Sequence, residues 1–351
     1  MDLRSKLFLF SFITGVMLAL ASCTGSPAVQ SKTPLWVIDQ GQAYPNSEWL
    51  CVVEREKEEK AAERAALSSL AQVFRVDLNS VTNANRQYAE AMGNAKGKSV
   101  YVSDESRDFA QDLVSTSTVS GLVGVQTETW ESRDGVWYAN ARMNRRECSA
   151  RYAAMIRENE RVIDHLKEEA GKNPETFEAY EMLNLARSVA LVTGNLHSLL
   201  TVLDPAAISR RLSYGNAEAV DTLAQNAARA IVITVNVNGI ESDRITKAFT
   251  ECFNSRGFRT NTTGRNPYIL DASFLLEDVE LENSPNKFVR YILNSSLRNI
   301  DGVEIFSFSE NKREGHLTEA EARQRTLRAA EQSIGSTGFA LKFDAFLASI
   351  L

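Results

Sequence analysis

Residues 152–192 read YAAMIRENERVIDHLKEEAGKNPETFEAYEMLNLARSVALV, and their hydrophobic spacing organises the rest of the chain. Apolar side chains recur every three or four residues over 152–170 and again over 177–192. This spacing is typical of amphipathic helices. An Asn-Pro-Glu sequence separates the two runs, and we expect the helices to end near Gly171 and Gly194. The stretch therefore predicts two antiparallel helices joined by a short turn.

The helical pattern extends over residues 149–229. A shorter apolar run, Leu196–Leu203, ends before Pro205, and residues 217–229 indicate a further helix. The region has two interpretations: a protruding hairpin that binds a partner, or a helical layer packed on either neighbour. We favour the packed layer, because an apolar helical face is more often buried core than a binding surface.

An α+β pattern precedes these helices, over residues 34–148. A short apolar run from Trp49 to Val53 indicates a strand, and an Ala-rich amphipathic helix follows it. Alternating residues then flank Asp134-Gly135, which is the signal of a type I′ hairpin turn. We therefore expect a β-α-β core followed by further strands, which is an α+β domain.

A second α+β pattern covers residues 230–351. An alternating strand over 231–237 is followed by an amphipathic helix that ends at Gly257. Three more strands and a helix come after it, so the predicted order is β-α-β-β-β-α. This order resembles small periplasmic domains of secretion-channel lipoproteins and of lipoprotein activators of wall synthesis, a likeness of topology alone.

The N-terminus has the pattern of a secretion signal. Arg4 and Lys6 precede a charge-free, largely apolar run, Leu7–Ala21. The run is too short for the ~20 residues that a spanning helix needs, so we interpret it as a cleaved signal peptide. It ends in Leu20-Ala21-Ser22-Cys23, which resembles the lipobox of bacterial lipoproteins.

The lipobox resemblance implies cleavage before Cys23 and acylation of its thiol. Two or three acyl chains give stable membrane attachment, whereas one chain binds only marginally. Thr24 after the cysteine is similar to the enterobacterial pattern for outer-membrane delivery. We therefore expect a protein anchored by lipid to a bacterial membrane, on its periplasmic side or at the cell surface, with the outer membrane as the expected site.

These patterns divide the chain into five parts, and the predicted fold class is α+β. The N-terminal α+β domain, a central helical hairpin layer and the C-terminal β-α-β-β-β-α domain form the folded body. The expected parts are a signal peptide (1–22), a lipidated tether (23–33), the first domain (34–148), the helical hairpin region (149–229) and the last domain (230–351).

The first domain also resembles a known family. A Trp after a proline, a Tyr-Pro pair, a strand leading into an Ala-rich helix and the late segment DGVWYANARM (134–143) are similar to the Lpp-twenty-like lipoproteins. The same domain occurs at the N-terminus of a flagellar basal-body ring protein. This chain departs from the family in having Val53-Glu54-Arg55-Glu56 where a Gly-x-Gly-like element is usual. The resemblance implies an envelope structural or accessory role and carries over no catalytic residues.

Composition excludes several function classes. Lys and Arg total 39 against 45 Asp and Glu, so the net charge of −6 does not suit a nucleic-acid backbone. Three histidines and four cysteines leave little material for metal or triad chemistry. No phosphate-binding glycine loop or nucleophile elbow is present. We therefore expect no catalytic residues, no metal and no cofactor, and a protein that is not an enzyme.

Three cysteines remain after lipidation of the fourth. Cys51 lies in the first strand and Cys148 just past the last strand of the same domain, so they form either a disulfide or two free thiols. Cys252 lies on the apolar face of a helix and reads as a small hydrophobic residue.

The expected function is that of a lipid-anchored, non-enzymatic structural or accessory component of a periplasmic or outer-membrane assembly, with the membrane and envelope proteins as partners. The alternative is a surface or periplasmic lipoprotein for ligand binding or adhesion. Four tryptophans would line its pocket, although we favour core positions for them: Trp36, Trp49, Trp130 and Trp137. A small-molecule ligand is thus not the expected partner.

Overall fold

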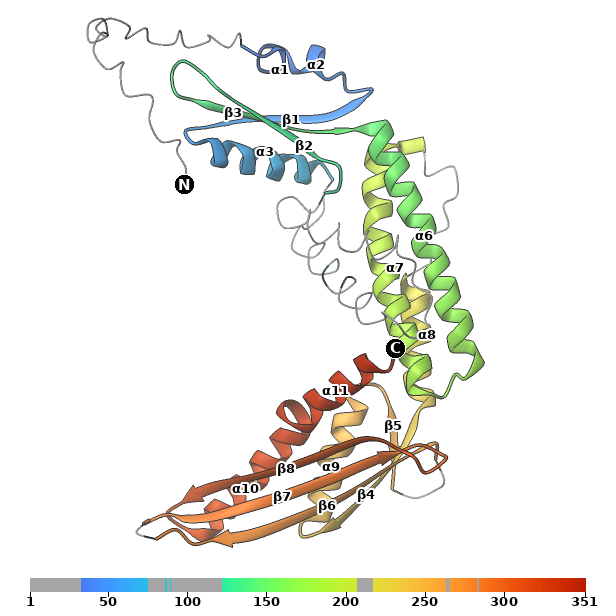
Figure 1. The fold of residues 1–351 in the computed structure, drawn as a ribbon, viewed down its shortest axis with the longest axis vertical. Coiled ribbons are helices and arrows are strands. Elements are labelled where there is room, and N and C mark those ends of the chain that lie inside the picture. Colours follow the sequence, from blue (N-terminus) through green and yellow to red (C-terminus); the bar gives the residue numbers. More distant parts are fainter. Residues whose placement is uncertain are drawn as a thin grey trace, which may run out of the picture.

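The computed structural model describes residues 33–74, 86, 89, 122–206, 217–262, 266–282 and 284–351. Within them the chain is α+β, as predicted, with two separate sheets and a layer of long helices between them (Figure 1). None of the described helices combines the length and the apolarity that crossing a membrane requires.

The first sheet has three strands in the order β1-β3-β2, all antiparallel. They are β1 (Trp49–Glu56), β2 (Gln126–Glu131) and β3 (Trp137–Asn144). The short helices α1 (Leu35–Ile38) and α2 (Gln40–Ala43) lie above this sheet in Figure 1, and α3 (Glu59–Val73) lies below it.

The α3 helix packs its small residues on the sheet. Ala62, Ala66 and Leu70 are fully buried against the alanines Ala139 and Ala141 of β3. Small side chains on both surfaces let the helix approach the sheet closely. The predicted Ala-rich amphipathic helix is therefore confirmed.

The β2–β3 hairpin forms at the predicted place but with a different turn. Gly135 N donates to Ser132 O at 3.0 Å, and Ser132 N donates to Val136 O at 2.8 Å. Gly135 has φ +73, whereas Asp134 has a negative φ. A type I′ turn needs positive φ at both central residues, so that prediction is wrong. The loop is instead a longer one, with glycine alone in the left-handed conformation.

The helical layer begins directly where β3 ends. Asn144 caps α6 (Arg145–Lys172) by accepting from Glu147 N at 3.0 Å, so residue 148, the expected domain boundary, lies inside the helix. Thr176 caps α7 (Phe177–Leu203) by accepting from Ala179 N. The two helices pack against each other along their lengths, which confirms the predicted hairpin.

Gly194 does not end a helix, contrary to the sequence prediction. It lies inside α7, which continues to Leu203. A glycine in a helix interior costs about 1 kcal/mol relative to alanine. Burial of Leu196, Leu199 and Leu200 against α6 offsets this cost, because each fully buried leucine contributes about 2 kcal/mol.

The helical layer shares a core with each sheet. Tyr152 and Ile156 of α6 and Leu200 of α7 belong to one cluster with the first sheet. At the other end of α7, Phe177 lies in the core of the second sheet, with its ring centroid 4.2 Å from that of Tyr268. The layer is therefore packed on both neighbours, and α8 (Ala217–Ala230) adds a smaller cluster beside it.

The second sheet has the order β5-β4-β6-β7-β8, in which β4 is parallel to β5 and β6 and the remaining pairs are antiparallel. Its strands are β4 (Val232–Gly239), β5 (Arg259–Asn261), β6 (Tyr268–Val279), β7 (Lys287–Arg298) and β8 (Glu304–His316). The three-residue strand β5 is absent from the predicted order. It is too short to show an alternating pattern, and pairing with β4 alone defines it.

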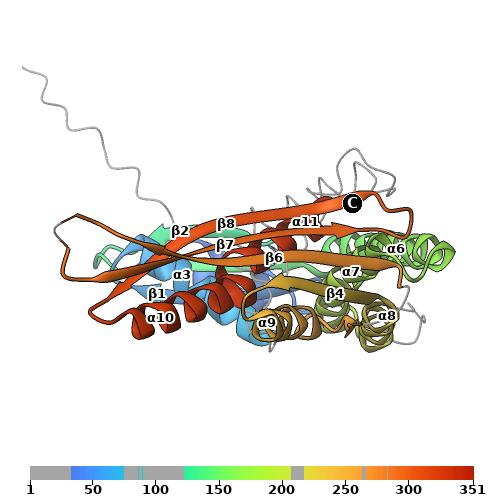
Figure 2. The same cartoon turned by 90° about the horizontal axis from the view of Figure 1, so that it is seen from below.

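Helices cover one face of this sheet and leave the other open (Figure 2). They are α9 (Ser242–Asn254), α10 (Glu319–Gln332) and α11 (Phe339–Ser349), the last two joined by a π-helical turn, Ser333–Thr337. Phenylalanines of α9 and α11 interlock edge to face, as Phe249 does with Phe339 at a centroid distance of 4.9 Å.

Glu181 of α7 is a partly buried acid near the C-terminal domain. Burial raises its pKa to about 7, a hydrogen bond from the Asn184 amide opposes this shift, and the Asp344 carboxylate of α11 adds to it. An acid whose pKa is raised on folding destabilises the fold once it ionises. The stability of the protein should therefore fall as pH rises from about 4.5 to 7.

We predict that Glu181→Gln stabilises the protein by about 2 kcal/mol at pH 8 and has little effect at pH 4.5, because glutamine carries no charge to desolvate. Urea unfolding at both pH values measures the difference. Exposed Glu178→Gln is the matched control and should show no pH-dependent gain. Equal stability of the Glu181→Gln variant and wild type at pH 8 would contradict the prediction.

We also predict that Tyr152→Phe destabilises the protein by about 1–3 kcal/mol. The Tyr152 hydroxyl accepts from Val123 N and donates to Val123 O, both at 3.0 Å, and phenylalanine leaves these buried groups unpaired. The measurement is the free energy of unfolding. Tyr138→Phe is the control, because the Tyr138 hydroxyl has no hydrogen bond within the described ranges; its loss should stay within about 0.5 kcal/mol.

Candidate functional site

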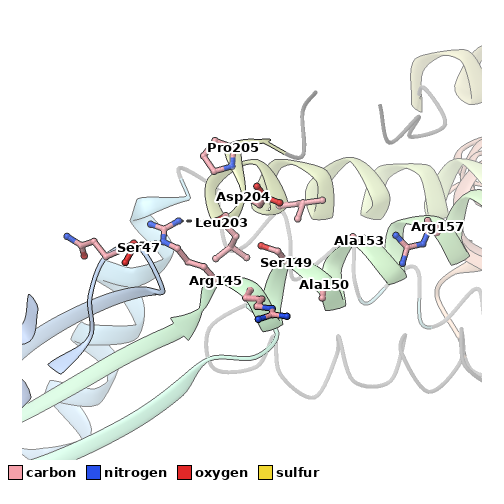
Figure 3. A pocket seen from close by; sticks show the side chains of 12 residues that line it. Ser47, Arg145, Ser149, Ala150, Ala153, Arg157, Leu203, Asp204 and Pro205 are labelled. Carbon is pink, nitrogen blue, oxygen red and sulfur yellow. Dashed lines mark hydrogen bonds between the residues drawn. The ribbon is translucent and has the colours of Figure 1, made fainter. Parts of the chain in front are cut away.

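An open cavity of about 920 Å³ lies where the first sheet meets the helical layer (Figure 3). One wall is the first part of α6, and the opposite wall is the end of α7. The loop after α2 closes one side with Asn46 and Ser47. The site thus joins three segments that are far apart in the sequence.

Arg145 holds these three segments together. Its Nη1 donates to Val202 O at 2.9 Å and to Leu203 O at 3.1 Å, and its Nε donates to Asn46 O at 2.9 Å. The last carbonyls of a helix lack partners within the helix and carry partial negative charge. A guanidinium at this position therefore satisfies them and fixes the end of α7 against the start of α6.

The α6 wall presents a basic face. Arg146, Ala150, Ala153 and Arg157 follow one another at spacings of four, three and four residues, so they share one side of the helix. Both arginines are exposed, and neither has a hydrogen bond or a salt bridge in the described part of the chain. Ser149 lies on the same wall, and its Oγ is buried without a hydrogen-bond partner.

The α7 wall is mainly apolar. Leu200, Leu203 and Pro205 line it. Asp204 is the one carboxylate among the lining residues, and it accepts from Ala206 N at 3.1 Å within its own turn. Three arginines and a single carboxylate therefore line the cavity, and that carboxylate already accepts a hydrogen bond. The local excess of positive charge contrasts with the net charge of −6 of the whole chain. The arrangement suits a ligand with an anionic group beside an apolar part.

Two further cavities lie in the C-terminal domain, and each holds a charged side chain that is already paired. In the first, of about 470 Å³, Arg244 is bound to Glu331. In the other, of about 560 Å³, Asp271 accepts from Asn236 at 2.9 Å and pairs with Arg298. No cluster of three potential metal ligands occurs among the residues that the structure describes.

The residues predicted from the sequence lie elsewhere. Leu20, Ala21, Ser22 and Cys23 are outside the described residues. Cys51 and Cys148 are both buried and free, so the disulfide alternative is not what the structure shows. Cys148 Sγ lies 3.7 Å from Gly124 O in the first turn of α6, whereas Cys51 lies within β1, opposite Arg142. Burial raises the pKa of both thiols, which disfavours the nucleophilic thiolate form.

The tryptophans do not form a binding pocket in the described structure. Trp36 is buried, and the other three are half-buried on the strands of the first sheet. None of the four lines any of the three cavities described above. Trp130 packs on Tyr138 with ring centroids 5.8 Å apart, and Trp49 packs on Tyr44.

The adjacent pair Arg145-Arg146 was not assigned to a site from the sequence. The missing member is Arg157, which the helix places on the same face as Arg146 although 11 residues separate them. The spacing Arg146, Ala150, Ala153, Arg157 was visible in the sequence. The apolar wall was not, because it comes from the end of α7.

The comparisons with known proteins do not name a family. No protein-family model and no curated protein matches the chain, so the resemblance to the Lpp-twenty-like family stays a prediction. A minor lipoprotein from Acinetobacter baumannii is 10% identical over 34% of this chain and 90% of its own, with a TM-score of 0.25. A secreted protein from Helicobacter pylori is 11% identical over 82% of this chain and 97% of its own, with a TM-score of 0.33. These scores do not indicate a shared overall arrangement, so neither protein's properties are transferred to this chain.

We predict that Arg145→Lys destabilises the protein by about 1–3 kcal/mol. Lysine keeps the charge, but one ammonium cannot reach all three carbonyls that the guanidinium holds, which leaves part-buried acceptors unpaired. Urea unfolding measures the change. Arg146→Lys next to it is the matched control and should cost less than about 0.5 kcal/mol, because Arg146 is exposed. Equal effects of the two substitutions would contradict this account of Arg145.

Proposed function

We propose that this chain is a lipid-anchored lipoprotein of the bacterial envelope. In this proposal it acts without catalysis, as a structural or accessory component of a periplasmic or outer-membrane assembly. The observation that carries the proposal is the helical layer that joins two separate sheets at a fixed spacing.

The spacing follows from helix geometry. α6 has 28 residues and α7 has 27, so each is about 40 Å long at 1.5 Å per residue. Because opposite ends of α7 are packed in the cores of the two sheets, the hairpin behaves as a strut and not as a linker. Buried Asn159 donates to Thr193 Oγ1 at 3.0 Å and sets the register of the two helices. A strut of this kind suits a protein that holds one domain at a distance from its anchor.

The anchor in this proposal is Cys23. The lipobox-like Leu20-Ala21-Ser22-Cys23 follows an apolar signal, and only a thiol is nucleophilic enough to become the thioether anchor. Thr24 favours delivery to the outer membrane. The partners would be the membrane, through the lipid, and envelope proteins that dock on the folded body; nucleic acid is not expected for an acidic chain.

We predict that protein purified from its native membrane has Cys23 as its first residue and carries the mass of two or three acyl chains. Cys23→Ala should abolish acylation and release the protein from the membrane fraction, whereas Thr24→Ser should leave it attached. Intact-mass measurement and membrane fractionation test this. An unmodified Cys23 in membrane-derived wild type would contradict the anchor.

The accessory role has a separate test. In-cell crosslinking from the open face of the second sheet, for example at Ser273 or Arg290, should recover a reproducible set of envelope proteins with the lipidated chain. The Cys23→Ala chain, released from its membrane, should lose them. Recovery of no protein partner in either strain would contradict the accessory role and leave the anchor intact.

A further inference from the structure

We propose that the basic cavity between α6 and α7 binds the phosphate group of an anionic phospholipid in the membrane that carries the anchor. This inference rests on the proposed function, because it takes the membrane to be held within reach by Cys23. It adds a second contact that would orient the first domain and the strut relative to the bilayer.

The chemistry of the lining fits a phosphate diester joined to an apolar body. Arg146 and Arg157 are exposed, and neither is engaged in a salt bridge among the described residues. Guanidinium groups bind phosphate oxygens through paired charge-assisted hydrogen bonds. Leu200, Leu203 and Pro205 line the same cavity from the end of α7, where Figure 3 labels Leu203 and Pro205.

The place of the cavity in the molecule supports a membrane ligand. Its residues Asn46 and Ser47 come directly after α2, and the start of α6 and the end of α7 lie at the same end of the molecule as α1 and α2, opposite the second sheet (Figure 1). α1 also presents Leu35 and Ile38, which are 47% and 69% exposed. The described chain begins at residue 33, ten residues after Cys23. A lipidated Cys23 therefore lies at most about 35 Å from residue 33, the length of that segment when fully extended.

Charge favours a phospholipid over an acidic protein segment. An anionic membrane repels a chain with a net charge of −6, so an anchored body needs a local positive site to rest on that surface. The anchor also keeps the bilayer at a high effective concentration beside the cavity, which lets a weak site be occupied. An acidic protein segment has no such tether to this end of the molecule.

The test uses the mature chain from residue 23 with Cys23→Ser, which carries no lipid. Vesicles of pure phosphatidylcholine are compared with vesicles of equal parts phosphatidylcholine and phosphatidylglycerol, by co-sedimentation at low and high salt. We expect binding to the anionic vesicles only, and weaker binding at high salt.

The double variant Arg146→Gln with Arg157→Gln should weaken this binding by about 25-fold, or about fivefold for each positive charge lost near the surface. The matched control is Arg229→Gln with Arg259→Gln, which removes two exposed positive charges on α8 and β5 and should bind as the parent chain does. Circular dichroism and the unfolding midpoint confirm that both variants are folded.

The inference is overturned by equal binding to both kinds of vesicle, by equal loss in the two double variants, or by no vesicle binding at all. Binding of inorganic phosphate at the cavity without any binding of anionic vesicles would assign the cavity to a soluble phosphate and overturn the lipid. So would binding of a glutamate-rich peptide at the cavity without vesicle binding. Because the chain in this assay has no acyl group, its failure leaves the Cys23 anchor untouched, and the mass of the native protein tests that anchor separately.

Discussion

The apolar face of α7 is the constraint on which the rest of the structure depends. Its first residue, Phe177, packs on Phe258 and Tyr268 in the core of the second sheet, while its last turns are buried with the first sheet. Because one continuous helix contributes to both cores, neither sheet can move relative to α7 without losing buried apolar area. α6 pairs with α7, and the buried bond between Asn159 and Thr193 opposes a shift in register, since an unpaired buried amide is costly.

The same packing creates the basic cavity. β3 runs into α6 without a linker, so the arginines of the first turns of α6 are carried to the place where α7 ends. There the guanidinium of Arg145 is engaged in hydrogen bonds within the protein, because it donates to the last carbonyls of α7 and to the Asn46 carbonyl. Arg146 and Arg157 make no such hydrogen bonds among the described residues. Two arginines without a salt bridge among the described residues therefore line one cavity with the end of α7, as a consequence of how the helices meet.

Particular elements show why sequence reasoning succeeded or failed. The α6–α7 pair, α3 and the position of the β2–β3 hairpin were predictable, because each is encoded by local periodicity or by an Asp-Gly turn. Gly194 was read as a helix end because glycine is a poor helix former, but burial of its neighbours against α6 outweighed that preference. The turn at Gly135 and the strand β5 depend on strand pairing, which no local pattern encodes. The spacing of the arginines that line the cavity could be seen in the sequence. The apolar wall could not, because a distant segment, the end of α7, supplies it.

The sequence by itself determined the α+β class, the two long helices and the lipobox-like motif at Cys23, because these depend on residue type and spacing along the chain. Only the tertiary structure decided that the helical layer is packed on both sheets, that Cys51 and Cys148 are separate buried thiols, and that Arg146 and Arg157 line one cavity with residues from the end of α7. These features depend on which distant segments share a core. Contacts of that kind are selected by the total apolar area buried and by the pairing of buried polar groups, which are properties of the whole fold.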